Sequence, residues 1–92
     1  MKIIGRKKLY EFKKKHSDAV SQIDAWEAET EIAEWKTSQD IKRRYASASF
    51  LADNHVIFNI KGNSYRLKIQ ISYKTKIVIV KNVGTHSEYM KW

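Results

Sequence analysis

Ten consecutive residues in the second half of the chain alternate strictly between apolar or aromatic and polar side chains. The apolar or aromatic positions are Tyr65, Leu67, Ile69, Ile71 and Tyr73, and the polar ones are Arg66, Lys68, Gln70, Ser72 and Lys74. Successive side chains of a β-strand point to opposite faces of a sheet, so this run predicts a strand with one buried and one solvated face. The chain must therefore form a sheet whose solvated face carries Arg and Lys.

Apolar segments on either side of this run predict two further strands. His55–Ile60 precedes it and Ile77–Val83 follows it. The connection Lys61–Ser64 contains Gly and Asn, which tolerate positive φ, and it predicts a hairpin. Lys74–Lys76 predicts the next turn. Because Ile77–Val80 is continuously apolar, we expect it to lie in an inner strand covered on both faces.

The N-terminal half shows helical spacing instead. Lys2–Gly5 is expected to form a short edge strand and Arg6–His16 a helix. Ser17 is a suitable N-cap for a second helix. Apolar or small residues recur in that helix at three- and four-residue spacing, which predicts a core-facing stripe: Ala19, Ile23, Trp26, Thr30 and Ala33. Thr37–Asp40 fits the capping-box pattern, so Ile41–Tyr45 is expected to belong to a short third helix.

The second helix carries a separate acidic stripe at the same spacing, made of Asp24, Glu27, Glu31 and Glu34. Paired carboxylates can bind a metal ion or perform acid–base catalysis. No His or other ligand type accompanies these carboxylates, so a solvated helix face is the better interpretation. We expect this face to point away from any RNA.

Helices followed by a mostly antiparallel sheet make an α+β layout, which we expect to form one domain over residues 1–92. The helices should cover the apolar face of the sheet and leave a concave basic face exposed. The net charge is +8, and from Ala48 to Trp92 there are seven Lys or Arg but only two acids, Asp53 and Glu88. Such segregation favours binding to a polyanion, namely RNA, DNA or an acidic protein, over a basic surface kept for solubility alone.

Several classes of protein are disfavoured by what the sequence lacks. There is no Cys, hence no disulfide framework, thiolate metal site or Cys nucleophile. The start of the chain has no long apolar core, and no apolar run approaches the length of a membrane span. We therefore expect a cytoplasmic protein with no membrane association. No P-loop, dinucleotide-binding, HExxH or G-x-S-x-G motif occurs, and the His residues lack metal-ligand spacing, so we expect no cofactor and no metal.

Three side chains match the requirements of RNA cleavage. The attacking 2′-OH must lose a proton, charge develops on the phosphoryl oxygens, and the leaving 5′-oxygen needs a proton. A His can transfer protons near neutral pH, an Arg fork can bind phosphate oxygens, and a Tyr can stack on a displaced base. His86, Arg66 and Tyr89 are the candidates. A structural hydrogen-bonding role for His86, a packed Tyr89 and a merely solvated Arg66 are the alternatives.

The order of several motifs resembles the HigB-type toxins of the RelE superfamily. These are the run from Asn59 to Leu67 (NIKGNSYRL), the run from Val83 to Tyr89 (VGTHSEY), Ser47–Leu51, Val56–Asn59 and the N-terminal Ile3–Ile4 before a charged helix. The resemblance implies a RelE-like toxin fold and a metal-independent endoribonuclease that cleaves mRNA, usually on the ribosome. It also implies a cognate antitoxin, in the HigA group a helix-turn-helix protein.

The resemblance also suggests roles for individual residues. The strand Arg of the family corresponds to Arg66, the basic or His position after the V-G pair to His86, and the C-terminal Tyr to Tyr89. Asn59, Lys61, Lys68 and Lys91 are expected to bind the RNA backbone. RelE-like members carry more Lys or Arg where this chain has Asn59 and Lys61. Which groups neutralise the phosphate, and whether His86 acts as base or acid, therefore stay open.

Two other functions compete with the nuclease. One is a non-catalytic RNA- or ribosome-binding domain that uses the same basic face. The other is a relative that kept the fold but inhibits a protein target such as gyrase. Members of that branch generally lack the nuclease residues, so His86 and Tyr89 count against it.

Overall fold

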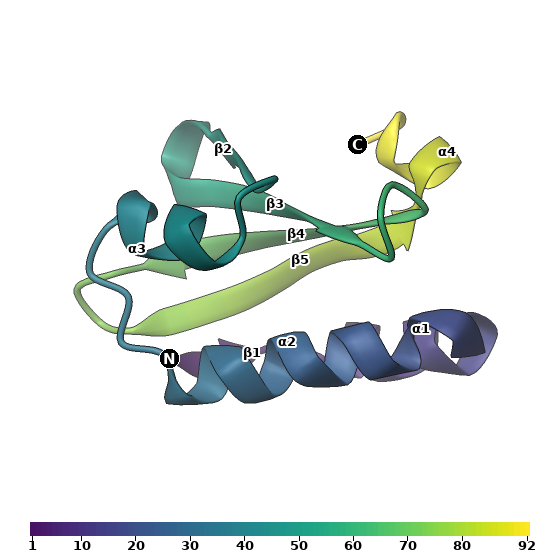
Figure 1. The fold of residues 1–92 in the computed structure, drawn as a ribbon, viewed down its shortest axis with the longest axis horizontal. Helices are drawn as coiled ribbons and strands as arrows, with labels where there is room; N and C mark the ends of the chain where they lie inside the picture. Colours follow the sequence, from purple (N-terminus) through teal and green to yellow (C-terminus); the bar gives the residue numbers. More distant parts are fainter.

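The computed structural model describes all residues, 1–92, and contains a five-stranded sheet with the strand order β1-β5-β4-β3-β2 (Figure 1). The strands are β1 (Lys2–Ile4), β2 (Ser49–Leu51), β3 (His55–Ile60), β4 (Tyr65–Ser72) and β5 (Ile77–Thr85). β1 runs parallel to β5, and every other neighbouring pair is antiparallel. The predicted α+β class and mostly antiparallel sheet are confirmed.

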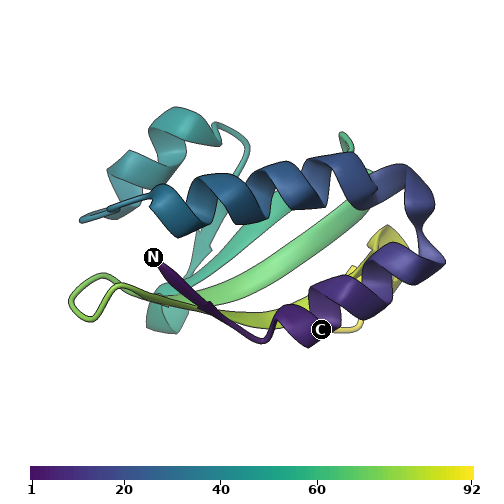
Figure 2. The ribbon, with the colours of Figure 1, turned by 90° about the horizontal axis from the view of Figure 1, so that it is seen from below.

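Two long helices cover one face of this sheet. α1 (Arg6–Lys15) and α2 (Val20–Ile32) lie below it in Figure 1 and cross in front of it in Figure 2. α3 (Ser38–Arg44) begins at the predicted capping box of Thr37 and Asp40. The short α4 (His86–Tyr89) lies on the opposite side of the sheet from α1 and α2 (Figure 1). The sheet therefore has a helix-covered inner face and an outer face that α1 and α2 leave open.

The start of the second helix differs from the prediction. Ser17–Ala19 form a single 3₁₀ turn, η1, and α2 begins after Ala19 without a side-chain cap. Asp18 accepts hydrogen bonds from the Lys61 ammonium and the Tyr65 hydroxyl. These tertiary contacts account for the tighter turn, because they engage Asp18 with the β3–β4 hairpin rather than with the helix end.

The core lies between the inner face of the sheet and the helices. Leu67, Ile69 and Ile71 of β4 are almost fully buried, as the alternation predicted. Trp26 of α2 packs edge-on against Phe58 of β3, with ring centroids 5.6 Å apart. Each fully buried aliphatic or aromatic side chain contributes about 1.5–3 kcal/mol, so this layer supplies most of the driving force that holds the helices to the sheet.

β5 departs from the expectation that both of its faces are covered. Val78 and Val80 are buried, but Ile77 and Ile79 are half-exposed because neither α1 nor α2 covers the outer face. After Val80 the ladder contains a bulge: Val80 pairs with Ile69, whereas the next pair is Asn82 with Lys68. Lys81 is thus an extra residue in the strand.

The bulge determines which way the end of β5 faces. Without it, the side chain of Asn82 would follow Val80 to the inner face. With it, Asn82 shares the outer face with Lys68, and Val83 packs against the core. The last residues of β5 therefore keep their apolar side chain inside and their polar one outside.

Three members of the acidic stripe, Asp24, Glu27 and Glu31, face α1 and are paired there with cations, whereas Glu34 lies beyond the end of α2. Arg6 contacts Glu27 at 2.8 Å and also contacts Glu31, and Lys13 contacts Asp24 at 2.6 Å. The hydrogen bond to Asp24 is the largest cause of the raised pKa of Lys13. These pairs place the stripe on the helical side of the molecule, away from the outer face, and assign it a role in joining α1 to α2.

No helix combines the length and apolar character that would let it cross a bilayer.

Candidate active site

The outer face of β3, β4 and β5 brings the predicted polar residues into two adjacent rows. Asn59 lies opposite Arg66, and Ile57 lies opposite Lys68. On the other side of β4, Arg66 lies opposite Gly84 and Lys68 opposite Asn82. Directly opposite residues in a sheet have Cβ atoms only about 4.5–5.5 Å apart. Asn59, Arg66, Lys68 and Asn82 therefore form one polar patch on the outer face.

α4 continues from β5 and is held beside this patch by a capping box. The Glu88 carboxylate accepts a hydrogen bond from the Thr85 backbone N–H at 2.9 Å, and the Glu88 N–H donates to the Thr85 hydroxyl at 3.2 Å. Gly84 allows the close approach, since a Cβ there would lie 2.9 Å from a Glu88 carboxylate oxygen. The segment Gly84–Glu88 thus sets the direction in which His86 and Tyr89 leave the sheet.

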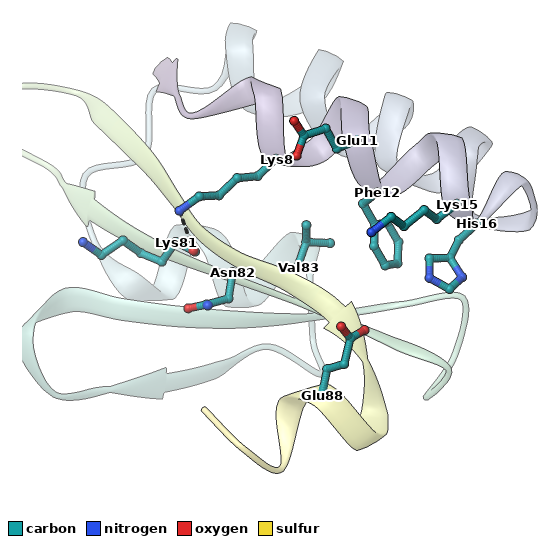
Figure 3. A pocket seen from close by; sticks show the side chains of 9 residues that line it. All are labelled: Lys8, Glu11, Phe12, Lys15, His16, Lys81, Asn82, Val83 and Glu88. Carbon is teal, nitrogen blue, oxygen red and sulfur yellow. Dashed lines mark hydrogen bonds between the residues drawn. The ribbon is translucent and has the colours of Figure 1, made fainter.

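Residues at the end of α1 lie beside the same cap on the inner side. Glu88, Lys15 and His16 line one cavity of about 270 Å³ between α1 and the end of β5 (Figure 3). The pKa of Glu88 is lowered, chiefly by the Thr85 N–H, with smaller contributions from the Thr85 hydroxyl, His16 and Lys15. The Glu88 carboxylate therefore ties α4 to the end of β5 and lies beside the end of α1.

The aromatic ring of Tyr89 is the centre of the cluster. The Arg66 guanidinium lies 5.5 Å from the ring centroid, within the range of a cation–π interaction. The His86 ring lies 6.1 Å away and the Trp92 ring 5.6 Å away. The structure thus brings Arg66, His86 and Tyr89 together, although β4 and α4 are far apart in sequence.

Arg66 is the only one of the four arginines without a carboxylate partner. Arg6, Arg43 and Arg44 each form an ion pair with Asp or Glu. Arg66 donates instead from Nη1 to the carbonyl oxygens of Asn63, at 3.0 Å, and Tyr65, at 3.3 Å. These bonds orient the guanidinium while Nε and Nη2 remain free to donate to an anion. An oriented cation with free donors is suited to binding a phosphate.

The other predicted RNA-binding lysines are in different positions. Lys68 is half-buried in the polar patch and forms no ion pair, and Lys91 is exposed two residues after the end of α4. Lys61 lies outside the cluster: its ammonium contacts Asp18 at 2.8 Å and its backbone N–H donates to the Gln22 side chain. The hydrogen bond from Lys61 is the largest cause of the lowered pKa of Asp18. The charge of Lys61 is thus directed toward the helices.

Sequence reasoning missed two contributors to the site. Asn82 joins the polar patch only because of the bulge at Lys81, which no sequence pattern announces. The pair Thr85 and Glu88 could have been found, since it fits the same capping-box pattern that located α3. The structure contains no group of three or more His, Cys, Asp or Glu side chains placed to hold a metal ion.

A family model described as HigB_toxin, the RelE-like toxic component of a toxin–antitoxin system, matches residues 19–92. The chain belongs to the HigB toxin family. The matched HigB region contains every member of the polar patch, the whole of α4 and strands β2 to β5. A search of the curated proteins found no match.

Membership in the HigB family confirms the recognition made from the sequence motifs. It identifies the chain as the toxic component of a toxin–antitoxin system, whose other component is an antitoxin. The α+β architecture, with helices on one face of a mostly antiparallel five-stranded sheet, is consistent with a RelE-like toxin fold.

Proposed function

We propose that this HigB family toxin is a metal-independent endoribonuclease that cleaves mRNA held in the ribosome. The observation that supports the proposal is the position of Arg66, an oriented guanidinium with free donors beside Tyr89 and near His86. A cation, a proton-transfer group and an aromatic ring on one open surface match the demands of phosphodiester cleavage.

The reaction would be an intramolecular transesterification at one phosphate of the RNA. The 2′-oxygen attacks the adjacent phosphorus and loses its proton, the bond to the 5′-oxygen breaks, and that oxygen gains a proton. The products are a 2′,3′-cyclic phosphate and a free 5′-OH. Arg66 would stabilise the charge on the phosphoryl oxygens, and His86 would transfer one of the two protons.

The remaining residues would hold the substrate. Tyr89 would position a nucleotide against its ring, and Lys68, Asn59 and Lys91 would contact the backbone. Lys61 would contribute only after release from Asp18. The cognate antitoxin, proposed to be a HigA-like helix-turn-helix protein, would neutralise the activity in the cytoplasm.

Two substitutions with matched controls test the proposal. Arg66→Ala and His86→Gln should relieve growth arrest on expression, whereas Arg43→Ala and His55→Gln should leave the arrest intact. Arg43 lies on α3 and His55 at the far end of β3, so both controls change the same residue type away from the cluster. Circular dichroism would verify that each variant folds. Full toxicity of both site variants would show that the assigned residues are wrong.

A non-catalytic RNA- or ribosome-binding protein is the second candidate, because the polar patch is an open surface that can bind RNA without cutting it. Purified toxin, ribosomes and mRNA distinguish the two functions. The nuclease predicts primer-extension stops that require Arg66 and fragments ending in a 2′,3′-cyclic phosphate. Binding alone predicts bound but intact mRNA.

A further inference from the structure

A small cavity lies beside the polar patch, and most of its lining residues have no role in the proposed function. It is called the C-terminal slot here, and its walls are Leu51, Ile57, Lys68, Tyr89, Met90 and Trp92. The slot lies where α4 and the residues after it pass over the outer face of β3 and β4. Its volume is about 260 Å³.

The volume and the lining of the slot suit one flat ring. Five of its six lining residues are hydrophobic, and Lys68 is the only charged one. Ligand pockets commonly measure about 300–1,000 Å³, so this volume suits a single ring system rather than a helix or a strand of a partner protein. The rings of Tyr89 and Trp92 meet at 78°, which forms an aromatic corner against which a ring can lie.

The slot is also adjacent to the cations of the candidate active site. Tyr89 forms part of its wall and is in contact with the Arg66 guanidinium. Arg66 and Lys68 are two residues apart on the same face of β4, so their Cα atoms are separated by about 6.7 Å. A phosphate at Arg66 would thus have its nucleoside within reach of the slot, with Lys68 between them.

We propose that the C-terminal slot binds the base of a nucleotide next to the scissile phosphate, with Trp92 as the residue that packs on it. Trp92 and Met90 keep large apolar surfaces in solvent, 40% and 70% exposed, and base stacking would cover them. The inference rests on the proposed function, because it places the base relative to a phosphate held by Arg66. The slot would then decide which phosphate of the RNA reaches His86.

The first experiment measures binding without cleavage. Trp92 is the exposed tryptophan of the chain, whereas Trp26 and Trp35 are buried at 1% and 7% exposure. A 2′-O-methyl RNA trinucleotide lacks the attacking hydroxyl and cannot be cut. It should quench the fluorescence of the wild-type protein and of Trp35→Phe, but not that of Trp92→Phe. Quenching that persists in Trp92→Phe, or none in the wild type, would overturn the inference.

The second experiment measures cleavage of ribosome-bound mRNA. Trp92→Ala should raise KM by roughly tenfold, as expected for loss of one base–aromatic stack, and should change the positions of the cuts. Trp92→Tyr should restore most of both. Phe50→Ala is the matched control, since Phe50 is an exposed aromatic of β2 outside the slot. A merely structural Trp92 would lower toxicity through stability without changing the cut positions.

The outcomes separate the slot from the nuclease. If the wild type cuts mRNA while Trp92→Ala has an unchanged KM and unchanged cut positions, the slot assignment is wrong and the nuclease stands. If the wild type does not cut but the trinucleotide quenches Trp92, base binding stands and the nuclease is wrong. If Trp92→Ala loses the antitoxin but retains the trinucleotide, the slot belongs to the protein partner and the inference is overturned.

Discussion

The chemistry proposed for Arg66 depends on the shape of its side chain as well as its charge. Its Nη1 is held by two carbonyl oxygens of the β3–β4 hairpin, and the guanidinium lies over Tyr89. A lysine ammonium at this position would keep the charge. It would lose the planar fork that fits phosphate oxygens and packs on an aromatic ring.

Arg66→Lys should therefore lose activity despite conserving charge. We expect a fall in kcat of about 10²–10³, the usual effect of removing one donor that stabilises transition-state charge. The measurement is the single-turnover rate of mRNA cleavage on ribosomes. The control variant Arg43→Lys should cleave at the wild-type rate. If Arg66→Lys were as active as the wild type, charge alone would be sufficient at position 66.

The lysines of the site can also be told apart one by one. Each phosphate contact to single-stranded RNA contributes about −0.7 to the slope of log K against log salt concentration. Lys68→Ala should reduce the magnitude of this slope by about that amount, because Lys68 has no carboxylate partner. Lys61→Ala should leave the slope unchanged, because the Lys61 charge is already paired with Asp18. A filter-binding series in KCl measures both values.

At the scale of secondary-structure elements, α4 is the part of the site that depends most on close packing. Its direction is set by the Thr85–Glu88 cap and by the absence of a side chain at Gly84. The cap is local in sequence, but its neighbours Lys15 and His16 come from the end of α1 and the residue after it. Changes at Gly84 and Thr85, the end of β5, should therefore alter activity more than they alter overall stability.

Gly84→Ala tests this dependence. The added Cβ would lie 2.9 Å from the Glu88 carboxylate, so α4 must shift or the cap must break, at a cost of about 1–3 kcal/mol. We expect cleavage to fall while the circular dichroism spectrum is retained. Gly62→Ala is the control: Gly62 has a φ of +63° and no neighbour within 4 Å, so it should lose some stability through strain but no activity.

The cap should also respond to acid. The folded pKa of Glu88 is lower than its ordinary value of 4.5, so ionised Glu88 stabilises the docked α4 above that value. The stabilisation should decrease as pH falls below about 4.5 and vanish once pH passes the lowered pKa. Trp92 fluorescence followed from pH 6.5 to 3 would report α4 leaving the sheet. Glu88→Gln should remove that transition, and an unchanged transition would assign it to another group.

The periodic elements were predictable from sequence because their signals are local. The alternation of β4, the core stripe of α2 and the capping box of α3 each lie within one segment. The pairing of Lys61 with Asp18 was not predictable, because the two residues are 43 positions apart. The exposed side of β5 was not predictable either, since an apolar run does not reveal that one face lacks a covering layer.

At the scale of the whole molecule, charge and architecture divide the protein into two sides. The acids of α2 neutralise Arg6 and Lys13 at the junction of the helices, whereas Arg66 and Lys68 on the outer face have no acidic partner. Lys14 and Lys15 of α1 also lack an acidic partner, so the net charge of +8 is not confined to the sheet. The excess of Lys and Arg in the C-terminal half is the part of this arrangement that composition predicted.

The two sides make a further prediction about association. Because Arg66 and Lys68 leave uncompensated positive charge on the outer face, the rate constant for binding RNA should fall steeply with ionic strength. Glu27→Gln on α2 removes a negative charge and so raises the net charge by one, but on the helical side of the molecule. It should change this rate far less than Lys68→Gln, which removes a positive charge from the outer face. Stopped-flow mixing with a labelled RNA measures both, and equal effects would mean that the total charge, rather than its placement, controls encounter.

The bulge in β5 gives the strand one spare residue. If codon 81 were deleted, Val80 and Asn82 would become neighbours and every later side chain would keep its own side of the sheet. Deletion of any codon from 77 to 80 would instead turn part of the strand over. A selection for non-toxic single-codon deletions should recover the deletion of codon 81. Unlike the other deletions, it should give a folded protein in which the strand is straightened and α4 points in a different direction. Codon 81 is thus the one position at which a deletion should preserve the alternation of inner and outer side chains and still abolish toxicity.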